Sequence, residues 1–138
     1  MPIQTLDHIN FVTADMKATR DFYCKVIGLV HGPKMPNANS GTEYFYIEGV
    51  KSPILHVGDA NTPSKQENFN RLATANKKTG FSTGSVDHFC LTVDAEDYDA
   101  VIERLNDHGV TYETFYSEDI SLTQVWALDP NGIRVELS

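Results

Sequence analysis

An internal repeat constrains the fold of this chain more than any other feature. Placing residue n over residue n+80 aligns residues 6–9 (LDHI) with residues 86–89 (VDHF), and residues 54–57 (ILHV) with residues 134–137 (RVEL). Such a repeat is the signature of a duplicated supersecondary unit. In a chain of 138 residues, two such units fill about one average domain. We therefore expect one domain, 1–138, built from a first module at about 1–58, a linker at 59–85 and a second module at 86–138.

The second copy has the pattern of a strand followed by a helix. Apolar and polar residues alternate along residues 88–93, which is the period of a half-buried strand. From Tyr98 to Leu105 apolar residues recur at helical spacing, with Asp94 as the expected N-cap and Gly109 at the end. Three strand-like segments follow, and a DPNG turn signal precedes the last of them.

The first copy repeats this pattern more loosely. Asp15 or Thr13 is expected to cap its helix, and Gly28 to end it. The buried face of this helix is predicted to hold Ala18, Phe22 and Val26. The strand-like segments after the two helices are residues 29–34, 43–48 and 52–58, and residues 110–116, 122–128 and 132–137. The pattern predicts an α+β fold, in which two tandem βαβββ modules form a curved mixed sheet with helices behind it.

Four potential metal ligands occupy matching positions in the two copies. His8 and His88 lie on the opening strands, and His56 and Glu136 lie on the closing strands. Apolar neighbours alternate with His56 and with Glu136, so both side chains point away from the face that receives the helix. Imidazoles and one carboxylate suit a borderline divalent ion such as Zn²⁺, Fe²⁺, Mn²⁺, Ni²⁺ or Co²⁺. We therefore expect a metal site on the open face of the sheet.

Other side chains share the strand parity of these ligands. Asn10, Cys90 and Arg134 are candidates for the surroundings of the site. The candidates for a pocket wall are Tyr44, Tyr46, Gln124 and Trp126. The residues expected to be structural are His31 and His108. The linker contains a group of basic residues, which indicates either a solvated segment or a clamp for an anionic substrate. These residues are Lys65, Arg71, Lys77 and Lys78.

Composition excludes several classes of partner. Nineteen acidic residues against eleven basic residues give a net charge of −8, which disfavours nucleic acid and anionic membrane surfaces. No apolar run approaches the length of a membrane span, and the first residues lack the pattern of a secretion signal, so we expect a cytoplasmic protein that acts on a small molecule. Cys24 and Cys90 form no Cys-x-x-Cys motif, so both are expected to be reduced thiols.

The motifs of this chain resemble those of the vicinal oxygen chelate superfamily. The resemblance is carried by the Asp-His pairs at 7–8 and 87–88, the Phe-Tyr pair at 22–23, the Gly-Leu pair at 28–29 and residues 129–137 (DPNGIRVEL). The superfamily includes glyoxalase I, methylmalonyl-CoA epimerase, extradiol dioxygenases, fosfomycin-resistance thiol transferases and bleomycin-binding proteins. The resemblance implies a glyoxalase-like fold around a metal site whose ligands are His8, His56, His88 and Glu136. Its members pair their modules within one chain or between two, and we expect a homodimer.

The resemblance also implies a function. A metalloenzyme of this kind binds a small substrate through two adjacent oxygens and performs isomerase or lyase chemistry, like lactoylglutathione lyase. The ion acts as a Lewis acid, and either Glu136 or His56 takes the carbon-bound proton. One departure is that glyoxalase I usually carries a glutamate, and the epimerase a glutamine, where this chain has His56. The alternatives are an extradiol-type dioxygenase with Fe²⁺ on His8, His88 and Glu136, and a non-catalytic antibiotic-binding protein.

Overall fold

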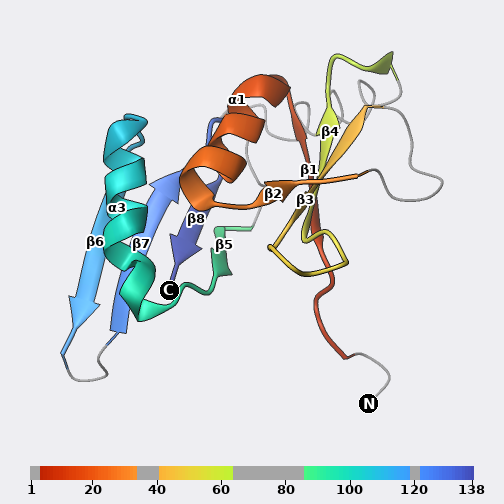
Figure 1. Cartoon of the computed structure of the whole chain (residues 1–138). Helices are drawn as coiled ribbons and strands as arrows, with labels where there is room; N and C mark the ends of the chain where they lie inside the picture. The colour runs from red at the N-terminus through yellow and green to blue at the C-terminus, as the bar shows by residue number, and fades with distance from the viewer. Residues whose placement is uncertain (1–3, 34–40, 64–85, 119–121) are drawn as a thin grey trace.

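The computed structural model describes residues 4–33, 41–63, 86–118 and 122–138, and Figure 1 shows their arrangement. Most of the expected linker, including its four basic residues, lies outside the described residues. The first half contains β1 (Ile9–Thr13), α1 (Met16–Asp21), the π-helix η1 (Phe22–Ile27), β2 (Val30–His31), β3 (Thr42–Tyr46) and β4 (Leu55–Asp59). The second half contains β5 (His88–Leu91), the 3₁₀ turn η2 (Ala95–Asp97), α3 (Tyr98–Asp107), β6 (Tyr112–Ser117), β7 (Leu122–Leu128) and β8 (Arg134–Leu137).

Each half forms its own four-stranded mixed sheet, with strand orders β1-β4-β3-β2 and β5-β8-β7-β6. In both sheets the first and last strands of the half are parallel neighbours, and the other pairings are antiparallel. The register of the parallel pair is also repeated, because Asn10 lies opposite His56 and Cys90 lies opposite Glu136. These observations confirm the predicted duplication and the α+β fold class.

The first helix follows its sequence signals at both ends. The Asp15 carboxylate accepts a hydrogen bond of 2.9 Å from the Ala18 N–H, which caps α1. Gly28 ends η1 with a φ of 96°, a left-handed conformation that glycine adopts without strain. The second part of this helix differs from the regular helix that the sequence predicts. The hydrogen bonds widen to π-helical spacing along η1, and Thr19 and Tyr23 become fully buried, whereas Ala18 stays half-buried.

The second helix begins differently from the prediction. Asp94 makes no side-chain capping bond; its carbonyl instead accepts the Asp97 N–H and starts the 3₁₀ turn η2. The expected apolar face is correct, because Val101 and Leu105 are almost completely buried and pack in the core. In Figure 1, α3 lies over β6 and β7, and α1 lies between α3 and the strands of the first sheet.

One hydrophobic core joins the helix-bearing faces of both sheets. It contains Phe45 and Leu55 of the first sheet together with Val125 and Val135 of the second. These residues alternate along their strands with the side chains of the opposite face. We call this opposite face the open face of each sheet.

Polar contacts between the modules reinforce this packing. The buried Tyr23 hydroxyl donates a hydrogen bond of 2.9 Å to Asp129 Oδ2. The Thr13 hydroxyl donates to Asn131 Oδ1 at 2.6 Å, and Arg104 Nε donates to the Val26 carbonyl at 2.8 Å. Because the two modules meet through their helix-bearing faces, their open faces point away from the shared core.

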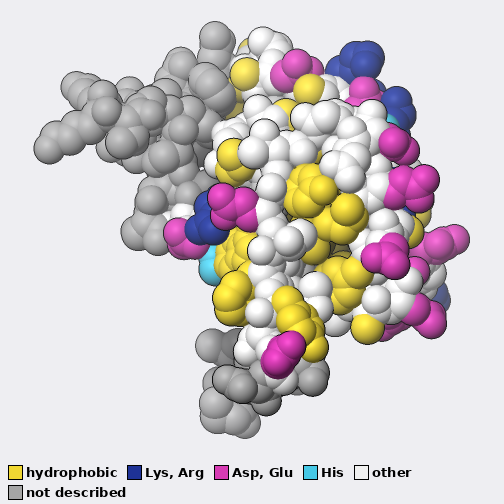
Figure 2. All heavy atoms as spheres, turned by 90° about the vertical axis from the view of Figure 1, so that its left-hand side faces the viewer, with side chains coloured by type: hydrophobic (Ala, Val, Ile, Leu, Met, Phe, Trp, Pro, Cys, Tyr) yellow, Lys and Arg dark blue, Asp and Glu magenta, His cyan; other side chains and the backbone are white. Residues whose placement is uncertain are grey.

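The surface is acidic where Figure 2 shows it. Asp and Glu side chains predominate over Lys and Arg on this face and flank a group of apolar side chains, in keeping with the net charge of −8. Among the described residues no helix is long and apolar enough to span a bilayer.

Candidate metal centre

His8 and His56 form the first donor pair, on the open face of the first sheet. His8 directly precedes β1, and its Nδ1 lies 2.6 Å from Asp7 Oδ2. The His8 ring stacks on the His56 ring, with centroids 3.8 Å apart and planes 10° apart. Tyr44, opposite His56 on β3, contacts the same ring edge-on at 4.8 Å. The pair therefore presents two adjacent imidazoles, of which His8 is oriented by a carboxylate.

The environment of His56 keeps its imidazole neutral. Burial penalises the charged form and the neighbouring His8 adds to this effect, so the pKa of His56 is lowered. Its Nε2 atom is buried, and no described group forms a hydrogen bond with it. A buried nitrogen without a partner is costly unless something else binds it. A metal ion is one such partner, because it requires the neutral imidazole.

His88 and Glu136 form the second donor pair, on the open face of the second sheet. His88 Nε2 lies 3.0 Å from Glu136 Oε2, and His88 Nδ1 lies 2.7 Å from Asp87 Oδ2. Glu136 is only 7% exposed, and the Gln124 amide donates to its other oxygen at 2.5 Å. The strand register fixes the spacing of this pair, because His88 lies opposite Arg134 and Cys90 lies opposite Glu136 on the parallel strands β5 and β8.

Arg134 and Trp126 support the second pair, and the arginine has no equivalent in the first. Arg134 Nη1 donates to the same Asp87 oxygen at 3.1 Å, and its guanidinium lies over the Trp126 ring at 4.6 Å from the centroid. The Trp126 ring in turn contacts His88 edge-on at 4.6 Å. The hydrogen bond from His88, and then the charge of Arg134, lower the pKa of Asp87. In the repeat, Ile54 occupies the position of Arg134, so Asp7 lacks this arginine.

The residue types fit a divalent metal ion. In both Asp-His pairs the carboxylate accepts from Nδ1, which leaves Nε2 as the nitrogen that can bind a metal. The structure, however, brings the four predicted ligands together as two pairs. Within the described ranges no group of three or more His, Cys, Asp or Glu side chains is close enough to hold one ion. The helix-bearing faces of both sheets are buried in the shared core, and each donor pair lies on the opposite face of its own sheet.

The other candidates divide into neighbours of the donor pairs and residues with roles elsewhere. Tyr44, Gln124 and Trp126 contact a donor directly, as described above. The Tyr46 hydroxyl donates to the Pro33 carbonyl. His108 bonds the Arg104 carbonyl and His31 pairs with Glu43, so both have the partners expected of structural residues.

The sequence analysis missed the role of Asp7 and Asp87 as partners of the two histidine Nδ1 atoms. The available signal was the Asp-His dipeptide, which recurs at the same position of both copies. Cys90 lies beside Glu136, and burial together with that carboxylate raises the pKa of its thiol. The Cys90 thiol therefore stays protonated at neutral pH.

Comparison with known proteins agrees with this fold. The structure resembles a glyoxalase/dioxygenase from Nostoc punctiforme (TM-score 0.72, 16% identity, covering 99% of this chain and 90% of that one). It also resembles lactoylglutathione lyase from Agrobacterium tumefaciens (TM-score 0.64, 19% identity, covering 99% of this chain and 94% of that one). A third similar structure is TnmS3, an antibiotic binding protein from Streptomyces sp. CB03234 (TM-score 0.62, 20% identity, covering 100% of this chain and 97% of that one). No curated protein sequence matches the chain. The model of the Glyoxalase/Bleomycin resistance protein/Dioxygenase superfamily matches residues 5–137, and the chain therefore belongs to this superfamily.

Proposed function

We propose that this protein is a divalent-metal-dependent enzyme that holds a small substrate through two adjacent oxygens and catalyses proton transfer of the isomerase or lyase type. The observation that supports this proposal is the matched pair of donor sets at equivalent positions of the repeat: His8 with His56, and His88 with Glu136. Both sets contain a histidine whose Nε2 is kept as the available nitrogen by an adjacent aspartate. Structural ion pairs alone do not explain this repetition.

The complete centre is formed by two copies of the chain. One chain presents its donor pairs on open faces that point away from a common core, so the pairs do not meet within it. In a two-fold dimer, the first open face of one copy meets the second open face of its partner, and the same contact occurs twice. Each dimer then contains two identical sites of three imidazoles and one carboxylate.

The residues around the centre have separate roles in the chemistry. A bound divalent ion supplies Lewis acidity that polarises a substrate carbonyl. Glu136, held on one oxygen by Gln124, is the first candidate to accept the substrate proton. His56 is the second candidate, because its lowered pKa keeps its imidazole neutral and basic at neutral pH. Asp7 and Asp87 orient the remaining histidines.

Complementation between two defective chains tests the shared centre. One variant carries His8→Ala and His56→Ala, and the other carries His88→Ala and Glu136→Ala. Co-expression with different tags allows the heterodimer to be isolated. In that heterodimer one site has lost all four ligands and the other keeps all four. We expect it to hold about half of the metal of the wild-type dimer, whereas either variant alone holds none.

The outcomes of this experiment separate the remaining functions. A heterodimer without metal, beside a metal-binding wild type, would contradict the shared centre. A wild-type protein that neither retains metal nor binds added Zn²⁺ or Fe²⁺ would contradict the enzyme and leave the antibiotic-binding alternative. Circular dichroism of the variants provides the control, because ligands on an open face are not needed for folding.

A further inference from the structure

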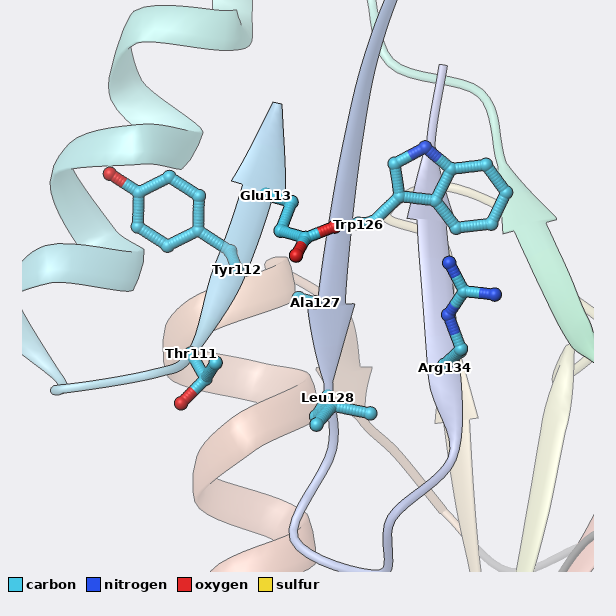
Figure 3. A pocket seen from close by; sticks show the side chains of 7 residues that line it. All are labelled: Thr111, Tyr112, Glu113, Trp126, Ala127, Leu128 and Arg134. Carbon is cyan, nitrogen blue, oxygen red and sulfur yellow. The ribbon is translucent and has the colours of Figure 1, made fainter. Parts of the chain in front are cut away.

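A small pocket lies on the open face of the second sheet, beside the donor pair His88 and Glu136. Its volume is about 210 Å³, below the roughly 300 to 1,000 Å³ of sites for drug-sized ligands, so it suits a small molecule or one end of a larger one. The residues that line it, shown in Figure 3, are Thr111, Tyr112, Glu113, Trp126, Ala127, Leu128 and Arg134.

Four of these side chains are relevant to ligand binding, and they are Glu113, Trp126, Leu128 and Arg134. Tyr112 points toward α3, where its hydroxyl bonds Asn106, and Ala127 is buried in the core. In Figure 3, the Glu113 side chain points from β6 toward β7, and the Trp126 indole extends from β7 in the other direction, with Arg134 of β8 below it and Leu128 at the lower end. Glu113, Trp126 and Glu136 lie opposite one another across three neighbouring strands. The pocket is therefore continuous with the proposed metal centre.

The pocket contains opposite charges that do not neutralise each other. No ion pair joins Glu113 to Arg134, and among the described residues the Glu113 carboxylate has no hydrogen-bond partner. Arg134 bonds Asp87 through Nη1 only, which leaves Nε and Nη2 as available donors. The indole of Trp126 covers one face of the guanidinium and holds it in place. A fixed cationic donor and a free anionic acceptor thus line the same small space.

This arrangement selects a ligand by its charge pattern. We propose that the pocket binds a zwitterionic group of the α-amino-acid type, at the end of the substrate that is not chelated. The position of the pocket beside a metal centre rests on the proposed function. A carboxylate receives paired hydrogen bonds from the Arg134 guanidinium, an ammonium group pairs with Glu113, and apolar carbons pack on Leu128 and Trp126. A simple anion is repelled by Glu113 and a simple cation by Arg134.

The only tryptophan of the chain makes this proposal directly measurable. Trp126 lines the pocket, so a ligand there changes the intrinsic fluorescence of the protein. Three probes share a phenyl ring and differ in charge: phenylalanine (zwitterion), 3-phenylpropionate (anion) and 2-phenylethylamine (cation). We expect saturable fluorescence changes, with phenylalanine binding at least about tenfold more tightly than either singly charged probe, or about 1.4 kcal/mol.

Variants assign the selectivity to the two charged side chains. Glu113→Gln should abolish the preference of phenylalanine over 3-phenylpropionate, and Arg134→Met should abolish its preference over 2-phenylethylamine. Glu103→Gln is the matched control, because Glu103 is an exposed residue of α3, on the helix side of the sheet. Equal binding of phenylalanine and 3-phenylpropionate by the wild type, no saturable change with phenylalanine, or an unchanged preference in Glu113→Gln would each overturn the proposal.

The titrations are made on the same dimer after chelator treatment and after metal loading, so the two proposals fail separately. Selective binding of phenylalanine by a protein that never holds metal would support the pocket and contradict the enzyme. A metal-binding heterodimer without selectivity in the pocket would contradict only the zwitterion site.

Discussion

In each Asp-His pair a single carboxylate orients a histidine of the proposed metal centre. Asp87 Oδ2 accepts hydrogen bonds from both His88 Nδ1 and Arg134 Nη1. This shared acceptor fixes the ring orientation of His88 and directs its Nε2 toward Glu136. Asp7 gives His8 the same contact without an arginine. Partners of this kind typically contribute 10- to 100-fold to metal affinity.

The first prediction concerns Asp87. Replacing Asp87 with Ala should lower the Zn²⁺ affinity of the dimer by about 10- to 100-fold, because His88 loses the partner that orients it. Isothermal titration calorimetry measures this change. Asp99→Ala, an exposed aspartate of α3, is the control and should leave the affinity unchanged. An equal affinity in both variants would mean that Asp87 does not position the ligand.

The second prediction concerns His56 and decides between two chemistries. If His56 is a fourth ligand, an octahedral ion would keep two open coordination positions, which suffice for a chelating substrate alone. If His56 does not bind the ion, three positions would stay open, which suffice for a catechol and O₂ together. We expect His56→Ala to lose most of its metal affinity, because the register gives His56 the strand position of Glu136. Undiminished affinity, with substrate-dependent oxygen uptake by the wild type, would favour the dioxygenase.

At the scale of elements, the junction of the two modules depends on a buried polar contact. The Tyr23 hydroxyl, from η1, bonds Asp129, which opens the turn before β8. Asp129 also accepts the Asn131 and Ile133 N–H groups, so one carboxylate joins the first helix to the last turn. Burial, and then the charge of Asp129, raise the pKa of Tyr23 well above its ordinary value.

This shift makes stability fall at high pH. In the unfolded chain Tyr23 ionises near pH 10, whereas in the folded protein it stays protonated. The contribution of Tyr23 to the free energy of unfolding is therefore fully present below about pH 10 and is lost as the pH rises toward the pKa of Tyr23 in the folded protein. We expect Tyr23→Phe to cost about 1 to 3 kcal/mol at neutral pH and to flatten the alkaline decline. Urea unfolding at a series of pH values measures both effects.

The control for this prediction is Tyr116→Phe, because the Tyr116 side chain is 60% exposed on β6. That variant should keep the neutral stability and the alkaline slope of the wild type. If Tyr23→Phe keeps the wild-type slope, the alkaline decline has another origin.

At the scale of the whole molecule, the proposed centre couples metal binding to association. In that proposal two copies supply the ligands of each centre, so each half-centre of a separated chain has only two of the four ligands. We expect the metal content per chain to fall when the protein is diluted below the dissociation constant of the dimer, and added metal to favour the dimer. Size-exclusion chromatography with metal analysis of each fraction tests both. A monomer fraction with full metal content would contradict the coupling.

The local order of the sequence determined much of this protein. The alternation along residues 88–93 and the helical spacing from Tyr98 to Leu105 predicted elements that the structure confirms, since local periodicity decides which face of an element is apolar. The 80-residue offset also holds for the register of the parallel strand pair in each sheet, because each copy buries the same face. The π-helix η1 carried no comparable signal in the sequence, and its Tyr23 side chain bonds Asp129 of the other module.

Only the tertiary structure decided how the four donors are distributed. The sequence placed His8, His56, His88 and Glu136 on open faces, and each side chain does lie opposite the helix of its module. Whether two open faces meet within a chain depends on which surfaces the modules use against each other. Here the helix-bearing faces join in one core, since burying both apolar faces together removes the most apolar surface from water. This packing separates the donors into pairs. The periodicity of one module depends only on which of its own faces is apolar, so it cannot predict the contacts between modules.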